Sequence, residues 1–172
     1  SGEDDIVVGT PVACREHPDL EQIIGMFVNT LPIRNQLQME GTFKDFLGEV
    51  KNNTIQAFQN QNYPFDMLVK ELDINRNQRR NPLFNTMFSL QEDFNSRVEI
   101  PELSLDILEL DNKNSKFNLT LDAYKIDNGL YFSFEYSTHL FQEETIQRMA
   151  EHFRNILDWI VTNPEKPLRE IE

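Results

Sequence analysis

The chain has 172 residues, 39% of them hydrophobic and 10% aromatic, and a formal net charge of −13 at pH 7. This charge repels nucleic acid and anionic membrane surfaces, and no apolar run approaches the roughly 18 residues of a membrane span. Because Cys14 is the lone cysteine, an internal disulfide and a multi-cysteine metal site are excluded. These properties predict one domain, or one large half of a bigger domain, and fit the cytoplasm.

The first part of the chain predicts a strand followed by a short helix. Ile6-Val7-Val8 favours a strand over residues 5–12. A helix begins at Pro18-Asp19 and ends at Gly25, because glycine is a common helix C-cap. The opening residues 1–5, which lack an initiator Met, suggest a piece of a longer polypeptide, and a removed tag would give the same opening.

Residues 24–34 read IGMFVNTLPIR, an apolar run that predicts a buried, extended segment closed by Pro32. Asn29 and Thr30 lie in its middle, where a core strand normally carries apolar side chains. Buried polar groups need hydrogen-bond partners. These two side chains therefore either bond to local backbone or face a cavity whose occupant bonds to them.

Two helices follow this segment. Thr42 begins the first, with Asp45 in the capping-box position, and the helix continues to Phe58. Tyr63-Pro64 begins the second, which continues to Leu72. Apolar residues recur at helical spacing in both. They are Phe43, Phe46, Leu47, Val50, Ala57 and Phe58 in the first helix, and Phe65, Leu68, Val69 and Leu72 in the second.

The middle of the chain is less regular. Residues 75–82 predict a polar loop and residues 83–90 a strand. A charged, irregular connection over 91–102 leads to an alternating segment over 103–107, with a bulge or bend at Leu108.

The last third predicts a hairpin and a helix. Two alternating segments, 117–123 and 130–136, flank Asp127-Asn128-Gly129, a pattern typical of a β-hairpin. The final helix begins near Gln142 and ends at Asn163-Pro164. Helices interspersed with strands predict an α/β fold in which a mixed β-sheet is layered with helices.

Few residues in the chain point to catalysis or metal binding. There is no Gly-rich phosphate loop and no Gly-x-Ser-x-Gly elbow. The three histidines, His17, His139 and His152, have no metal-ligand spacing. A pairing of His17 or His139 with Cys14 stays open as a nucleophilic arrangement. We predict no metal site and assign no catalytic residue.

Four stretches carry a resemblance to a known family. Residues 6–15 read IVVGTPVACR, residues 24–34 read IGMFVNTLPIR, residues 60–66 read NQNYPFD and residues 76–83 read RNQRRNPL. In this order they resemble motifs of the condensation domains of nonribosomal peptide synthetases, and the similarity covers nearly the whole chain. The matching positions include Gly25, Phe27, Val28, Arg34, Gln61, Pro64, Phe65, Arg76, Arg80, Asn81 and Pro82.

The chain departs from the family's pattern at four positions. Cys14 stands where the family has glycine, which strains that turn or alters a pocket wall. Asn62 and Asn77 replace aspartate, and Arg79 replaces serine. If the family's Arg–Asp contact in the last motif is structural, Asn77 weakens it.

The family's His-His-x-x-x-Asp-Gly motif, which carries its catalytic histidine, does not occur in the 172 residues. The resemblance therefore implies that residues 1–172 are the C-terminal half of a condensation domain, a half-domain with a chloramphenicol-acetyltransferase-like fold. In the family the two halves enclose a tunnel. Carrier proteins insert phosphopantetheine arms from both ends, and the acceptor amine attacks the donor thioester to form a peptide bond.

By this resemblance the half supplies a tunnel wall and a carrier-docking surface in antibiotic or siderophore biosynthesis. Its partners are the N-terminal half, aminoacyl and peptidyl carrier proteins and an adjacent adenylation domain, and it binds no cofactor directly, only the carriers' arms. We assign Asn29 and Thr30 to the tunnel, against the alternative that Asn29 bonds to local backbone. Arg76, Arg79 and Arg80 form a basic island that meets an acidic partner or faces solvent.

Two other functions are open. One is a self-contained protein-binding module, which would bury its apolar surface alone, and the other is a trimeric acyltransferase with His139 as its base. Under the condensation-domain interpretation the isolated chain is inactive. Residues 91–107 then correspond to a segment that crosses to the first half, and we expect them to contact a second copy of the chain.

Overall fold

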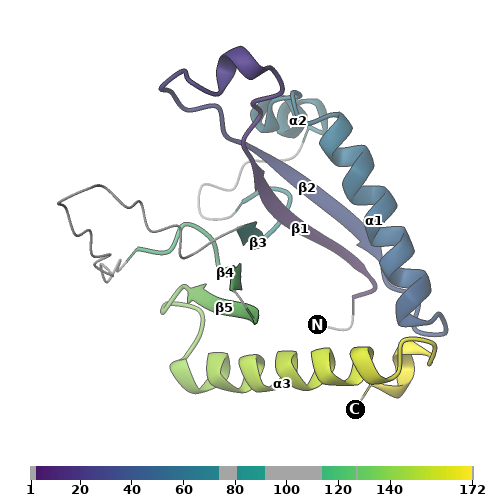
Figure 1. The fold of residues 1–172 in the computed structure, drawn as a ribbon. Coiled ribbons are helices and arrows are strands. Elements are labelled where there is room, and N and C mark those ends of the chain that lie inside the picture. The colour runs from purple at the N-terminus through teal and green to yellow at the C-terminus, as the bar shows by residue number, and fades with distance from the viewer. Residues whose placement is uncertain (1–2, 74–80, 92–113, 127, 172) are drawn as a thin grey trace.

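The computed structural model describes residues 3–73, 81–91, 114–126 and 128–171 (Figure 1). Within them a five-stranded sheet has the order β2-β1-β3-β4-β5. β1 pairs in parallel with β3, as β3 does with β4, whereas β2 and β5 pair antiparallel with their neighbours. The predicted α/β fold with a mixed sheet is thus confirmed. The strands are β1 (Asp5–Val12), β2 (Asn29–Gln36), β3 (Thr86–Gln91), β4 (Leu119–Ile126) and β5 (Gly129–Tyr136).

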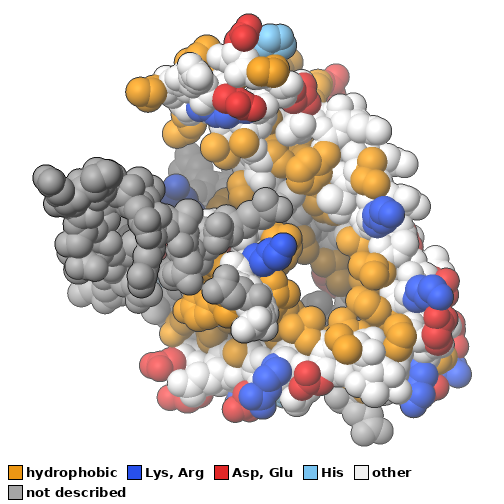
Figure 2. All heavy atoms as spheres, viewed as in Figure 1, with side chains coloured by type: hydrophobic (Ala, Val, Ile, Leu, Met, Phe, Trp, Pro, Cys, Tyr) orange, Lys and Arg blue, Asp and Glu red, His pale blue; other side chains and the backbone are white. Residues whose placement is uncertain are grey.

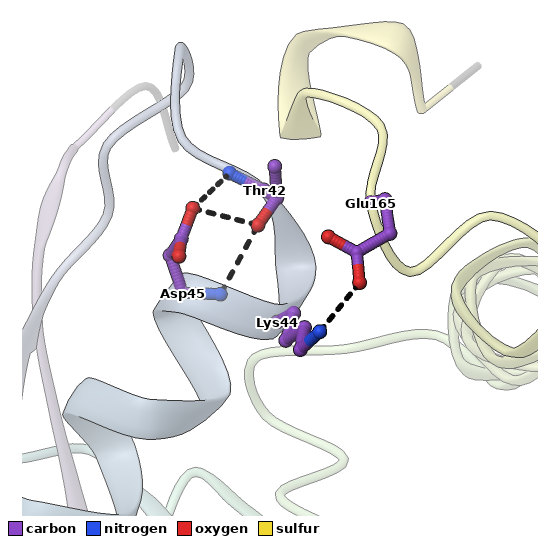
Figure 3. A network of polar contacts seen from close by, with 4 residues as sticks. All are labelled: Thr42, Lys44, Asp45 and Glu165. Carbon is purple, nitrogen blue, oxygen red and sulfur yellow. Dashed lines mark hydrogen bonds and ion pairs between the residues drawn. The ribbon is translucent and has the colours of Figure 1, made fainter.

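The three α-helices of the described residues form where the apolar periodicity predicts them. They are α1 (Phe43–Gln59), α2 (Phe65–Glu71) and α3 (Glu143–Thr162), and η1 (Pro18–Leu20) and η2 (Leu168–Glu170) are short 3-10 helices. The capping box at the start of α1 is confirmed, because Asp45 N donates to Thr42 Oγ1 at 3.1 Å and Thr42 N donates to Asp45 Oδ2 at 3.4 Å (Figure 3). Lys44 Nζ contacts Glu165 Oε1 at 2.7 Å and so ties this end of α1 to the segment after α3.

Both long helices lie on the same face of the sheet. α1 contacts β2, where Asn53 Nδ2 donates to Asn35 Oδ1 at 2.9 Å. α3 contacts β5, where the ring of Phe153 meets Phe132 at 5.1 Å and Phe134 at 6.1 Å between centroids. Paired residues on neighbouring strands point to the same side of a sheet. The register of the strands therefore places Asn35 of β2 on the same face as Phe132 and Phe134 of β5.

The predicted helix from Pro18 to Gly25 is wrong, because only the three residues of η1 are helical. Arg15 accounts for the early end of the helix, since its guanidinium donates to the carbonyl oxygens of Leu20, Ile23 and Gly25. These bonds hold the backbone after η1 in a path that is not helical.

The segment 24–34 is not buried throughout, contrary to the prediction. The side chains of Ile24, Met26 and Val28 are exposed, and burial begins only with Leu31 and Ile33 in β2. Nor does Pro32 close the segment, because β2 continues to Gln36. Proline is tolerated there because β2 is an edge strand, where a missing N–H does not interrupt a second ladder.

The remaining element boundaries differ by a few residues. The strand predicted from residue 83 begins at Thr86, and the hairpin is confirmed, with Ile126 paired to Gly129. Pro64 is the N-cap of α2, and α3 follows Gln142 as its N-cap. The predictions for residues 75–80, for residues 92–107 and for Leu108 lie outside the described residues. Gln91, predicted to begin the irregular connection, instead ends β3. Within the described part, no helix is long and apolar enough to cross a membrane.

The sheet has a small buried core, in which the ring of Phe84 lies close against Gly9. A Cβ added at Gly9 would lie 2.3 Å from Cε2 of the Phe84 ring. Gly9 is also the residue of β1 that pairs with Met87 of β3. The buried apolar residues are Val12, Leu31, Ile33, Val69, Phe84, Met87, Ala123, Ile146 and Leu168.

Gly9→Ala is therefore expected to destabilise the chain by about 1–3 kcal/mol, because the buried ring must move to admit the methyl group. Urea denaturation followed by circular dichroism measures this change. Gly48→Ala is the control, since Gly48 lies inside α1 with no atom within 4 Å of the added Cβ. That change is expected to stabilise by about 0.5–1 kcal/mol, as alanine does within a helix. Equal effects of the two substitutions would refute the packing argument.

Candidate functional site

The side-chain amide of Asn29 lies at the centre of the motif residues. Its Nδ2 donates to the carbonyl oxygens of Gln61 and Tyr63, both at 2.8 Å, and its Oδ1 accepts from the backbone N–H of Phe65 at 3.2 Å. The amide thus bonds at both ends to the backbone just before and at the start of α2. Asn29 therefore bonds to backbone, as in the alternative to a tunnel role. That backbone is not local, because it lies more than 30 residues along the chain.

Cys14, two residues after the end of β1, joins the same junction. Cys14 Sγ donates to the Gln61 carbonyl at 3.3 Å, and Glu16 accepts from the side chains of Gln61 at 2.8 Å and Asn62 at 2.6 Å. Cys14 has a φ of 48°, in the left-handed region that favours glycine. The strain expected where the family has glycine is therefore present, and the thiol's position gives it a structural partner.

The last motif reaches the junction through Phe84. Asn81 Oδ1 accepts from the backbone N–H groups of Leu83 at 3.1 Å and Phe84 at 3.4 Å, which fixes the turn before β3. This turn places the Phe84 ring against the edge of Phe65, with centroids 5.7 Å apart, and beside Phe117 at 5.6 Å. Phe65 therefore links the second and third motifs. Pro82 is half-buried in the turn, whereas Arg76, Arg79 and Arg80 lie outside the described residues.

Arg15 holds the loop that precedes β2. Besides the three carbonyls already named, its guanidinium carbon lies 4.3 Å from the centroid of the Phe27 ring, a cation–π contact. Gly25 supplies one of the bound carbonyls at 3.1 Å. The side chains of Ile24 and Met26 project from this held loop into solvent. Arg15 was not among the predicted site residues, because the sequence around a single arginine does not indicate which carbonyl groups it binds.

Arg34, the last residue of the first motif, joins the edge strand β2 to its neighbour β1. Its Nε and Nη2 donate to the carboxylate oxygens of Asp5 at 2.9 and 2.7 Å, a bidentate pair. The hydrogen bond from Arg34 lowers the pKa of Asp5, and the same bond raises the pKa of Arg34. Both groups are solvent-exposed, so this pair fixes geometry more than it adds stability.

Tyr63 follows the second motif's amide cluster and is tied to α2. Its hydroxyl donates to Glu71 Oε2 at 2.5 Å, and this bond raises the pKa of Tyr63. The bond spans the length of α2, so the junction and this helix are held as one unit.

The described residues provide no catalytic constellation. His17 Nδ1 accepts from Asp19 N at 3.2 Å, so this ring caps η1, and His139 and His152 are exposed. The described residues hold no group of three metal-ligating side chains. The Thr30 hydroxyl, next to Asn29 in β2, has no hydrogen bond within the described ranges. Of the two predicted tunnel residues, Asn29 thus uses its polar group in bonds within the chain, whereas the hydroxyl of Thr30 makes no hydrogen bond to the described residues.

Comparison with known families and sequences gives a consistent result. A family model described as "Condensation domain" matches residues 1–172. The chain is 49% identical over 171 residues to tyrocidine synthase 3 of Brevibacillus parabrevis, covering 99% of the chain and 3% of that protein. It is 48% identical over 172 residues to gramicidin S synthase 2 of Brevibacillus brevis, covering 100% of the chain and 4% of that protein.

The fold is also found in solved structures. The chain matches a four-domain nonribosomal peptide synthetase bound to AMP and glycine with a TM-score of 0.89 and 22% identity, over 100% of the chain and 14% of that protein. It matches the X-domain from teicoplanin biosynthesis with a TM-score of 0.89 and 20% identity, over 100% of the chain and 40% of that structure. The sequence therefore spans a small part of its curated relatives and under half of this solved domain.

Proposed function

Because the chain belongs to the condensation-domain family, we propose that residues 1–172 form the C-terminal half of a condensation domain. In this proposal the complete domain joins aminoacyl and peptidyl groups carried as thioesters on phosphopantetheine arms. The observation that carries the proposal is the match of the whole chain to the family, together with its coverage of 40% of the solved X-domain. The adjacent partners are carrier proteins and an adenylation domain.

The proposed reaction is a simple acyl transfer. The amine of the acceptor attacks the thioester carbonyl of the donor, a C–N bond forms, the C–S bond breaks, and the donor arm leaves as a thiol. Orientation of the two arms contributes much of the rate in such a reaction. The family's motif with the catalytic histidine does not occur in residues 1–172, so in this proposal the half orients the reactants and the other half provides proton transfer.

The junction of the three motifs supports a wall function. Asn29, Phe65 and Phe84 hold β2, α2 and the turn before β3 at one end of the sheet. A wall built in this way keeps its shape without a ligand, and preorganised walls orient substrates most effectively. Thr30 is the residue of this wall that we assign to hydrogen bonding with a substrate or pantetheine amide.

We predict that residues 1–172 alone form no peptide bond between two loaded carrier proteins, whereas the complete parent polypeptide does. Mass spectrometry of the carrier-bound products measures peptide-bond formation by each protein.

Thr30→Val in the complete polypeptide is expected to slow product formation by about tenfold, for one lost hydrogen bond of about 1.4 kcal/mol. Thr54→Val, in the middle of α1, is the matched control. Product formed by residues 1–172 alone would refute the half-domain assignment.

The structure disfavours a self-contained module. Such a module buries its own apolar surface, whereas α1 here has no buried residue over its full length. The acyltransferase alternative gains no support either, because His139 is exposed.

A further inference from the structure

The helix-bearing face of the sheet is open between α1 and α3. Figure 2 shows a hollow in this region, lined by hydrophobic side chains on the sides of both helices and of the sheet. In the described residues the two helices are joined at one corner, where Lys44 N donates to Pro164 O at 3.1 Å and Leu168 N donates to Gly41 O at 2.9 Å. From that corner the helices diverge (Figure 1), so neither covers the centre of the face.

Both helices carry more apolar surface than the chain covers. α1 has no buried side chain, and α3 buries Ile146 alone. Ala57 packs toward β2 and Phe153 toward β5, yet the apolar residues beside these contacts stay exposed, with 52% of Leu47 and 39% of Ile156 accessible. The exposed apolar residues on these elements are Leu47, Ile55 and Phe58 on α1, Met149, Ile156 and Val161 on α3, and Phe88 and Leu90 on β3.

Exposed apolar side chains gathered around a hollow mark a place where another segment packs. We infer that the hollow is the seat of one apolar α-helix, contributed by the same condensation-domain polypeptide from outside residues 1–172. The inference rests on the fold and the family and not on the proposed reaction, so it holds or fails whether or not the domain forms peptide bonds.

A helix fits this place better than a strand does. The hollow is bounded by helix flanks and by the face of the sheet, and none of these offers free backbone groups to an added strand. A helix satisfies its own backbone hydrogen bonds and can be buried on all sides. The eight residues of β1 span about 26 Å, a length that about 17 helical residues match. Because it is enclosed on three sides, the helix must be apolar over most of its surface.

The same polypeptide is the occupant that the comparisons favour. The chain covers 40% of the solved X-domain, so the larger part of such a domain lies outside these residues. β1 begins in the space between α1 and α3 (Figure 1). A second copy is disfavoured, since both copies carry a net charge of −13.

The first test measures access to the hollow in the complete parent polypeptide. Leu47→Cys and Ile156→Cys are alkylated with N-ethylmaleimide, and the rate at each peptide is read by mass spectrometry. Asn52→Cys and Asn155→Cys are the controls, because both residues are exposed on the same two helices. We expect the first pair to react about 100-fold more slowly than the controls in the native state and equally fast in denaturant. Equal native rates would overturn the inference.

The second test identifies the occupant. A benzophenone-maleimide attached at Leu47→Cys is photolysed in the complete polypeptide, and the captured peptide is sequenced. The inference requires an apolar peptide of the same polypeptide from outside residues 1–172. Capture of a peptide within 1–172, or a cross-linked dimer of two polypeptides, would overturn it. If the complete polypeptide formed no peptide bond but its cysteines at positions 47 and 156 were alkylated slowly, this inference would stand and only the proposed function would be refuted.

Discussion

Phe84→Ala is expected to lower the free energy of unfolding of the chain by about 3–5 kcal/mol, because it empties the best-enclosed aromatic site in the described core. The ring is 3% exposed and covers Gly9, which has no side chain of its own. It also contacts Phe65 and Phe117 through edge and tilted geometries that add to the burial energy. Its removal leaves a cavity between β1, α2 and the start of β4.

Urea denaturation of the purified chain measures this effect, and two variants bracket it. Phe58→Ala removes the same atoms from a ring that is 42% exposed, and about 1 kcal/mol is expected there. Phe84→Leu retains most of the volume and is expected to cost less than about 1.5 kcal/mol. In the Phe84→Leu background Gly9→Ala is expected to cost less than it does alone, since the ring atoms that it meets are gone. Additive costs would show that the two residues do not share one packing site.

Much of the fold follows from local patterns in the sequence. The helical spacing from Phe43 to Phe58 and the alternation on either side of Asn128-Gly129 predict α1 and the β4–β5 hairpin to within three residues at each end. Thr42 and Asp45 form the predicted capping box. These features depend on neighbours along the chain, which the sequence displays directly.

Patterns that depend on distant partners were predicted less well. The run from Ile24 to Val28 is apolar enough to suggest burial, yet its side chains are exposed because Arg15 holds their backbone in a projecting loop. Apolar composition shows that a residue is suited to burial and not which segment covers it. The same limit applies to Leu47, which belongs to the predicted apolar stripe of α1 but remains exposed here.

The candidate site combines both situations. The motifs identified Asn29, Gln61, Phe65 and Asn81 as important residues, and the structure brings these four to one end of the sheet. Spacing alone gave no indication that the Asn29 side chain bonds to backbone more than 30 residues away. Such contacts form only once β2 and α2 are packed together, so no local window of sequence contains them.

Asn29→Ala is expected to destabilise the chain by about 3 kcal/mol, since it removes three hydrogen bonds worth about 1 kcal/mol each. The loss is expected to be concentrated at the junction, where the Gln61 and Tyr63 carbonyls and the Phe65 N–H lose their partner. Urea denaturation measures the global change, and hydrogen exchange of the Phe65 amide reports the local one. Asn52→Ala, at an exposed position in α1, is the control and is expected to change stability by less than about 0.5 kcal/mol.

Asn29→Asp separates a structural role from a tunnel role. The introduced carboxylate faces two carbonyl oxygens, so its charged form is disfavoured and its pKa is raised in the folded state. A group with a raised folded pKa adds stability below its unfolded pKa of about 3.9 and loses it as pH rises through the folded value. The deficit relative to wild type is thus expected to be larger at pH 8 than at pH 5, whereas Asn52→Asp shows no such trend. Unchanged stability of both Asn29 variants, with slowed peptide-bond formation in the complete polypeptide, would instead assign the amide to the substrate tunnel.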